Sequence, residues 1–115
     1  MIKLTFCLKR LPGLSRAEFQ AYWRETHAPL VQRNAKVLGI VRYVQSHSLP
    51  EGTATALAQA RGSGGQDYDG VAELWWDSME SFTAAGQTAE GRTAGQVLLE
   101  DEGRFIDLPN SPIFL

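Results

Sequence analysis

The chain is poor in the residues that build disulfides and metal sites. Cys7 is the single cysteine among 115 residues, so no internal disulfide can form. No group of cysteine and histidine has zinc-like spacing, and we expect no metal. The patterns GxGxxG, GxxxxGK(S/T) and HExxH are also missing, so nothing in the sequence indicates a nucleotide or an organic cofactor. The lone thiol favours a reducing, cytoplasmic location.

Long hydrophobic runs and blocks of one charge are missing as well. No segment is apolar for long enough to span a bilayer, and residues 1–10 carry charges inside their apolar run, unlike a signal peptide. Lysine and arginine (11 together) are scattered among 13 acidic residues, for a net charge of −2. Because no basic stripe with interleaved aromatics exists, we expect neither nucleic acid nor a membrane as a partner.

What is present is the pattern of one small α+β domain covering residues 1–115. The chain is 43% hydrophobic and 21% charged, which is typical of a globular protein. Alternating apolar and polar residues predict strands over 2–10, 40–49 and 68–76. Helical spacing predicts a short helix from 78 to 85, with Met79, Phe82 and Ala85 facing inward, and a longer one over 89–102. A last strand is expected over 104–108 or 113–115, at an edge.

This order of elements predicts a ferredoxin-like α+β sandwich with a four-stranded antiparallel sheet. Helices would cover one face of that sheet. The other face would carry Thr5, Cys7, Arg42 and Val44, and this mixture predicts a homodimer formed sheet to sheet. Glu73 is expected to be paired on that face, with Arg42 as a candidate partner.

The connection over residues 51–67 is rich in glycine, alanine, threonine and serine and is longer than usual. Residues 54–60 can form a short helix inside it. The whole segment is either a lid or an insertion. Its Gly62-Ser-Gly-Gly run is no phosphate loop, because no lysine follows.

The most informative stretch is residues 14–39, which reads as an amphipathic helix. Ser15 and Glu18 have the spacing of a capping box, and Gly39 suits the C-terminal end. Pro29 predicts that the helix ends or kinks near His27 and restarts with Pro29 in its first turn. His27 follows the apolar face, where a backbone carbonyl near Glu25 or a strand residue could satisfy it; otherwise it is the centre of a site.

Three further residues qualify as companions of His27. Tyr43 and His47 share one strand face, and if that face turns toward the helices, Tyr43 could hold an oxyanion while an imidazole moves a proton. The alternatives are core packing for Tyr43 and simple solvation for His47. Asp101 lies on the apolar face of the last helix, where its pKa should be raised unless it is paired. It could orient a histidine, cap a helix end or pair with Arg104.

Aromatic residues are numerous for so small a chain, and they suit an aromatic or terpenoid-sized ligand. Trp23 and Trp76, together with His47, are the candidate substrate-binding residues. Aromatics at strand and helix spacing are equally consistent with core or dimer packing.

Several blocks resemble the EthD family. The run Ser-Arg-Ala-Glu-Phe-Gln-Ala-Tyr-Trp-Arg-Glu-Thr-His-Ala-Pro-Leu, over 15–30, is similar to its hallmark helix, and residues 39–47, 68–78 and 101–107 resemble its second strand, third strand and last helix. The resemblance implies a dimeric α+β barrel, in which two ferredoxin-like sandwiches join through their sheets. That superfamily includes cofactor-free monooxygenases, lactone isomerases, polyketide cyclases and haem-handling proteins.

Two main hypotheses of function follow. The first is a cofactor-free enzyme of oxidoreductase, monooxygenase, isomerase or cyclase type, acting on a hydrophobic oxygenated substrate between sheet and helices. His27 would be its acid or base, supported by Tyr43 and Asp101. The second is a non-catalytic binding or accessory module for a hydrophobic metabolite. A weaker third idea is haem handling, with a histidine as the axial ligand.

Overall fold

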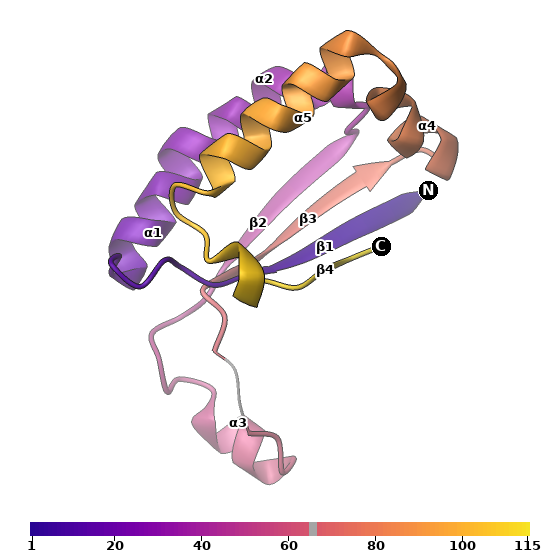
Figure 1. The fold of residues 1–115 in the computed structure, drawn as a ribbon. Helices are drawn as coiled ribbons and strands as arrows, with labels where there is room; N and C mark the ends of the chain where they lie inside the picture. Colours follow the sequence, from indigo (N-terminus) through magenta and orange to yellow (C-terminus); the bar gives the residue numbers. More distant parts are fainter. Residues whose placement is uncertain (65–66) are drawn as a thin grey trace.

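A computed structural model describes residues 1–64 and 67–115 and shows one antiparallel sheet of four strands (Figure 1). The strands are β1 (Ile2–Leu8), β2 (Arg42–His47), β3 (Gly70–Trp76) and β4 (Ile113–Phe114). Their spatial order is β2-β3-β1-β4. The predicted α+β fold with ferredoxin-like topology is therefore confirmed. Residues 65–66, inside the glycine-rich connection, lie outside the described part of the chain.

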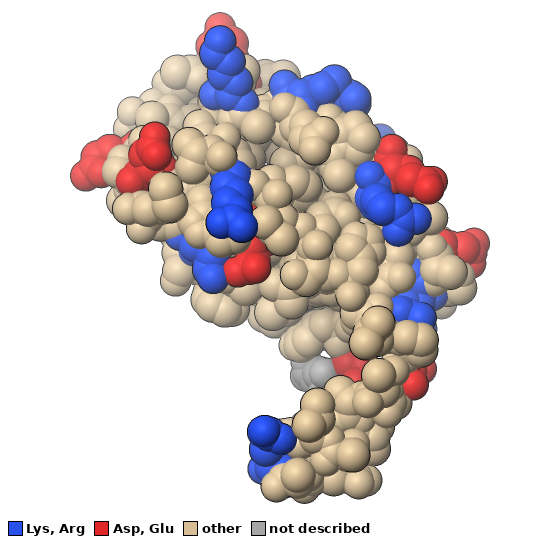
Figure 2. All heavy atoms as spheres, turned by 180° about the vertical axis from the view of Figure 1, so that it is seen from behind, with Lys and Arg blue, Asp and Glu red and all other residues tan. Residues whose placement is uncertain are grey.

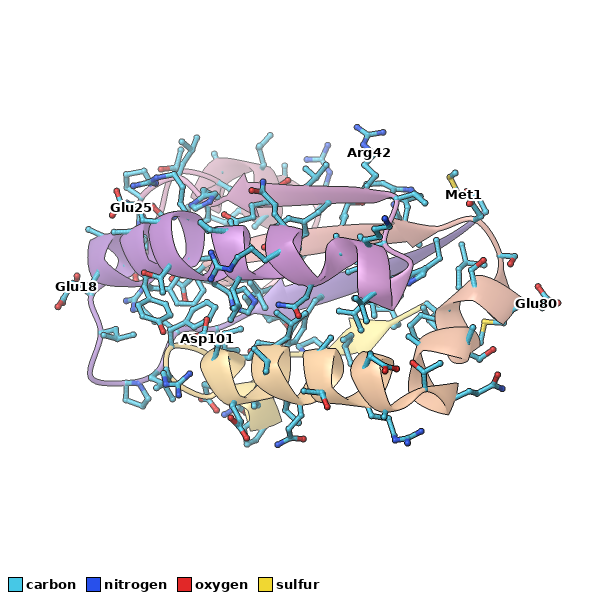
Figure 3. All side chains as sticks on the ribbon, turned by 90° about the horizontal axis from the view of Figure 1, so that it is seen from above. Met1, Glu18, Glu25, Arg42, Glu80 and Asp101 are labelled. Carbon is cyan, nitrogen blue, oxygen red and sulfur yellow. The ribbon has the colours of Figure 1, made fainter. Side chains whose placement is uncertain are left out.

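The helices lie on one face of the sheet (Figures 1 and 3). The first helical segment consists of α1 (Arg16–Tyr22), a π-helical turn η1 (Trp23–His27) and α2 (Ala28–Leu38). The second consists of α4 (Met79–Ala84), the 3-10 turn η2 (Ala85–Gln87) and α5 (Ala89–Glu102). A further 3-10 turn, η3 (Leu108–Asn110), precedes β4. The short helix α3 (Thr55–Ala60) lies in an arm that projects from the body.

Local signals in the sequence explain where the first helical segment begins and ends. The Ser15 side chain accepts from the Glu18 backbone N–H, and the Glu18 carboxylate accepts from the Ser15 N–H, as a capping box requires. Gly39 ends the segment with a φ of 76°, in the left-handed region that suits glycine. Both predictions are confirmed.

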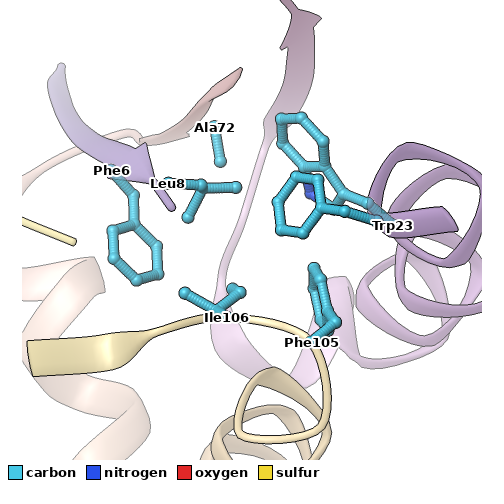
Figure 4. Packing of buried hydrophobic residues seen from close by; sticks show 7 residues of the cluster. Phe6, Leu8, Trp23, Ala72, Phe105 and Ile106 are labelled. Atoms are coloured by element: carbon cyan, nitrogen blue, oxygen red, sulfur yellow. The ribbon is translucent and has the colours of Figure 1, made fainter. Parts of the chain in front are cut away.

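The core lies between the helices and the inward face of the sheet (Figure 4). Phe6 and Leu8 of β1 and Ala72 of β3 meet the aromatic rings of Phe19, Trp23 and Phe105 and the side chain of Ile106. Register explains this arrangement, because Phe6 pairs with Ala72 and every second residue along each strand points the same way. The same alternation points Tyr43, Gln45 and His47 of β2 toward the helices.

The opposite face of the sheet carries no element of the described chain. Arg42 points away from the helices there (Figure 3), and its guanidinium lies 4.8 Å from the centre of the Trp75 ring. Glu73 is paired on this face as predicted, but with Lys3 at 2.7 Å rather than with Arg42. Lys3 and Arg42 both pair with Trp75 from the two strands beside β3, and the Arg42 guanidinium lies over the Trp75 ring instead of reaching Glu73.

Some boundaries and orientations differ from prediction. Strand β2 covers Arg42–His47 rather than 40–49, and Met79, expected to face inward, is exposed at the start of α4. Of the two alternatives for the last strand, 113–115 is correct: the strand is Ile113–Phe114, while Ile106 makes only an isolated bridge with Arg10. Helix α2 begins at Ala28 with Pro29 in its first turn, as predicted, but the chain does not break there. Its backbone stays right-handed through Tyr22, His27 and Ala28, and the missing proline N–H is accommodated by the π-helical turn just before it.

Charge is mixed on the surface. Figure 2 shows Lys and Arg side chains interspersed with Asp and Glu on the visible face, above the projecting arm. Within the described residues, no helix is both long and apolar enough to cross a membrane.

Candidate functional site

The π-helical turn places His27 against the last helix. The backbone N–H of Ala28 bonds to the carbonyl of Trp23, five residues back, which is the π pattern. Because bonds of this length bring residues five apart toward one side of the helix, both Tyr22 and His27 reach Asp101 on α5. Single π turns of this kind occur frequently at functional sites.

Asp101, which Figure 3 shows between the first helical segment and α5, joins three side chains. Its Oδ2 lies 2.7 Å from His27 Nδ1, and its Oδ1 accepts from the Tyr22 hydroxyl at 2.6 Å and from Arg104 Nη1 at 3.2 Å. His27 and Asp101 are only 5% and 4% exposed, and the His27 ring packs 5.0 Å from Phe105. Both expected roles of Asp101, orienting a histidine and pairing with Arg104, are therefore present. The partner of His27 is this carboxylate and not a carbonyl near Glu25.

The partners decide the protonation states. Burial lowers the pKa of His27, although the hydrogen bond and charge of Asp101 raise it, so the imidazole is neutral near pH 7. Burial raises the pKa of Asp101, but hydrogen bonds from Tyr22, His27 and Arg104 outweigh it, and the net pKa is lowered. An ionised carboxylate only accepts, so His27 Nδ1 carries the hydrogen and Nε2 carries a lone pair. No described residue hydrogen-bonds to Nε2.

A second polar cluster lies on β2. Gln45 Nε2 donates to the Tyr43 hydroxyl at 2.7 Å and to the Trp23 carbonyl at 2.9 Å, while Gln45 Oε1 lies 2.8 Å from His47 Nε2. The His47 ring packs 4.5 Å from the Trp23 ring, and its Nδ1 is buried without a partner among the described residues. Burial lowers the pKa of His47, helped by the charge of Arg24. His47 is thus packed into the structure rather than simply solvated.

Tyr43 links this cluster to the last helix. The pKa of its hydroxyl is raised, chiefly by burial and also by the charge of Glu102. Hydrogen bonding with the Gln45 and Trp23 side chains acts in the opposite direction and lowers this pKa. Glu102, at the end of α5, is half-buried. Burial, together with the neighbouring charge of Asp101, raises its pKa to about 7.

One solvent-open pocket, of about 760 Å³, lies between the body and the arm and is lined by residues such as Arg10, Arg16 and Glu51. Another, smaller pocket, of about 230 Å³, lies between α2 and β2 and is lined by Tyr43 and by Val31, one helical turn beyond His27. His27 itself lines neither pocket.

The structure brings five of the six predicted site residues into two clusters: His27 with Asp101, and Tyr43 with Trp23 and His47 around Gln45. Trp76 lies elsewhere, donating its indole N–H to the Leu38 carbonyl at 2.7 Å and packing edge-on against Phe82. It pairs with Ile2 at one end of β3, whereas His47 pairs with Gly70 at the other. Trp76 therefore supports the end of α2.

Sequence reasoning missed two members of the two clusters, Tyr22 and Gln45. Gln45 could have been found, because it lies between Tyr43 and His47 on the same strand face. Among the described residues, no group of histidine, cysteine, aspartate and glutamate could hold a metal ion.

Comparisons with known proteins now place the chain in a family. Residues 11–109 match the model of the EthD domain. The conidial pigment biosynthesis dehydratase EthD of Metarhizium robertsii is 33% identical over 84 residues, which cover 71% of this chain and 59% of that protein. The chain therefore matches less than two thirds of the length of this curated relative.

Solved structures support the fold. An ethyl tert-butyl ether D (EthD) family protein from Bacillus halodurans has a TM-score of 0.58 at 20% identity, covering 100% of this chain and 98% of its own. A dimeric protein of unknown function and ferredoxin-like fold from Bacteroides fragilis has a TM-score of 0.58 at 10% identity, covering 97% and 90%. Since the family model spans most of the sequence, the chain belongs to the EthD family.

Proposed function

We propose that this protein is a cofactor-free acid–base enzyme that dehydrates a small, hydrophobic, oxygenated ring compound. One observation carries the proposal: a neutral histidine is buried against an ionised aspartate, with its Nε2 lone pair unused. The dehydratase name of the Metarhizium relative favours elimination of water over the other reactions open to such a base. Monooxygenase and isomerase or cyclase chemistry would begin with the same proton abstraction.

In the proposed reaction, His27 Nε2 removes a proton from the carbon next to a carbonyl group. The Nδ1–H bond to Asp101 stabilises the imidazolium that forms, and Tyr22 and Arg104 keep that carboxylate ionised and in place. The Tyr43 hydroxyl donates to the enolate oxygen. A positioned base of this kind contributes about 10²–10⁴-fold to the rate.

The smaller pocket gives a ligand a place beside the site, although His27 does not line it. Its walls include Tyr43 and Val31, so a ligand entering between α2 and β2 reaches the edge of the site. At about 230 Å³ it is smaller than the usual ligand pocket of roughly 300–1,000 Å³. The proposal therefore requires a small substrate and a shift of side chains that uncovers Nε2.

Deuterium exchange into α-tetralone tests the base directly, because this bicyclic ketone has exchangeable protons and no leaving group. We expect the protein to accelerate exchange in D₂O, followed by NMR, and His27→Gln to lose about 10²–10⁴-fold. Arg24→Gln, an exposed change in the same π turn, should keep the rate. If α-tetralone binds but exchanges no faster than in buffer, the protein is a non-catalytic binding module. An unchanged rate in His27→Gln would refute the assignment of the base.

We further propose that the protein is a homodimer joined through the open face of the sheet. Val71, Glu73 and Trp75 stay partly exposed on this face because no described element covers them, so a second copy could bury them. The Bacteroides fragilis neighbour is described as dimeric. Analytical ultracentrifugation should give twice the chain mass. Val71→Arg on this face should yield monomers, whereas Val37→Arg, exposed on α2, should not. A monomeric wild-type protein would contradict the proposal.

A further inference from the structure

The pocket between the body and the arm takes no part in the proposed dehydration. Its walls come from three stretches of the chain, residues 9–16, 48–54 and 67–69, and neither His27 nor Tyr43 lines it. At about 760 Å³ it lies within the range of roughly 300–1,000 Å³ that is usual for ligand sites. Figure 2 shows basic and acidic side chains together where the arm joins the body. The pocket is therefore large enough for a small molecule and has charged groups to recognise one.

A continuous chain of hydrogen bonds holds two arginines on one wall of this pocket. Arg16 Nη1 donates to the Ser48 carbonyl at 2.6 Å, and the Ser48 backbone N–H and hydroxyl donate to the Asp69 carbonyl. Asp69 is only 7% exposed, and its carboxylate accepts from the Arg10 backbone N–H at 2.8 Å and from Arg10 Nη1 at 2.5 Å. Both guanidinium groups are thus positioned before a ligand arrives, which reduces the entropic cost of binding.

The charges of the pocket are unevenly paired. Its lining includes three cationic and three acidic residues: Lys9, Arg10, Arg16, Glu51, Asp67 and Asp69. Two of the acids, Glu51 and Asp69, bind Arg10. Arg16 donates to a neutral carbonyl, and within the described part of the chain neither Arg16 nor Lys9 has an acidic partner. These two cations and one exposed acid, Asp67, remain, and this balance favours an anionic ligand.

Glu51, at the start of the arm, already places a carboxylate in this pocket. Its Oε1 lies 3.0 Å from Arg10 Nη2, and its side chain is 64% exposed. Exposed ion pairs contribute little to stability, so the carboxylate of a ligand can take this place while the buried Asp69 stays on Nη1. The arm therefore carries a competitor for an anionic ligand.

Apolar side chains complete the walls of the pocket. Leu14 packs against the hydrophobic core, whereas Leu49 is 69% exposed, and Pro12 and Pro50 are exposed as well. A ligand with a hydrophobic body would remove this surface from water, which is favourable.

We propose that this pocket is a second binding site, for a small molecule that carries a carboxylate group on a hydrophobic body. The guanidinium group of Arg16 presents parallel N–H donors that match a carboxylate, and Lys9 adds a second positive charge. Arg10 joins them when Glu51 moves aside. The site is separate from the His27–Asp101 pair and does not depend on the proposed dehydration.

Isothermal titration calorimetry with 1-naphthoate tests the site, and 1-naphthalenemethanol, which has the same rings without the charge, is the control ligand. We expect naphthoate to bind about tenfold more tightly than the alcohol. Arg16→Gln should weaken naphthoate binding about 10–100-fold, because a charged hydrogen-bond donor is lost. Glu51→Gln should tighten it about two- to fivefold, because the competing carboxylate is removed. Arg33→Gln, exposed on α2 outside the pocket, is the matched control and should leave the affinity unchanged.

Loss of structure cannot imitate this set of results. A gain of affinity in Glu51→Gln cannot come from unfolding, and Gln20 still donates to the Ser48 carbonyl, at 2.9 Å, when Arg16 is replaced. No binding of naphthoate, equal binding of the two ligands, unchanged affinity in Arg16→Gln or no gain in Glu51→Gln would overturn the inference.

Amide NMR locates the bound ligand. Naphthoate should shift the signals of Lys9, Ser48 and Asp69 and leave those of Val31 and Tyr43, which line the smaller pocket, in place. The affinity should also persist in His27→Gln. Shifts confined to the smaller pocket would assign the ligand to the proposed catalytic site and refute the second site. Failure of the α-tetralone exchange, in contrast, would refute only the proposed function.

Discussion

Replacing Asp101 with alanine is expected to lower the free energy of unfolding by about 3–5 kcal/mol. The change removes the acceptor of two buried donors, the Tyr22 hydroxyl and His27 Nδ1–H, and the partner of Arg104. Buried donors without partners cost about 1–3 kcal/mol each, and the cavity left under α5 adds to this. Such a loss is a large fraction of the stability of a domain this size.

Urea denaturation near neutral pH measures this loss, and its pH dependence gives a second check. The pKa of Asp101 is lowered from its ordinary 3.8, so the stabilisation by its carboxylate is present above that value and is lost as the pH falls through the lower folded pKa. The difference in the free energy of unfolding between wild type and Asp101→Ala should therefore become smaller in strong acid. Asp101→Asn keeps an oxygen acceptor for His27 and should lose less. A loss below about 1 kcal/mol for the alanine variant would contradict the buried network.

Two glycines of α5 should respond in opposite directions to the same substitution. A Cβ at Gly91 would overlap the Ala85 carbonyl oxygen and lie 2.7 Å from the Ala85 carbonyl carbon. Because the obstruction is backbone, η2 and α5 must separate, and Gly91→Ala should cost about 3 kcal/mol. Gly95 has nothing within 4 Å of a Cβ, so Gly95→Ala should stabilise the helix by roughly 0.5–1 kcal/mol.

Thermal unfolding of the two variants beside wild type tests this contrast. Each variant serves as the control for the other, because both add the same methyl group to a glycine of the same helix. Equal effects of the same sign would mean that α5 does not pack on η2 as described.

The order of strands and helices could be predicted from the sequence because the signals are local. Alternation marks β1 and β3, the capping box begins α1, and Gly39 ends α2. The π turn could not be predicted, because Pro29 shows only that an ordinary hydrogen bond is missing. Whether the chain breaks or widens there depends on what the helix packs against, including Phe105 from the far end of the chain.

The candidate site was predictable only where a local pattern in the sequence marks its residues. His27 was identified from its place on a helix face, but its pairing with Asp101 joins residues 74 apart and needs the tertiary fold. Trp76 was grouped with the site by residue type alone, and the register of β3 places it at the other end of the sheet.

The arm that carries α3 leaves and rejoins the body at one clamped point. The Ser48 backbone N–H and hydroxyl both donate to the Asp69 carbonyl, at 3.1 and 3.0 Å, directly beyond the last pair of β2 and β3. The entropic cost of closing a loop at such a point rises only slowly with the length of the loop. Related chains can therefore gain, lose or exchange this segment without disturbing the register of β2 against β3, and with it the positions of Tyr43, Gln45 and His47. This makes the arm a natural place for tags, labels and evolutionary insertions.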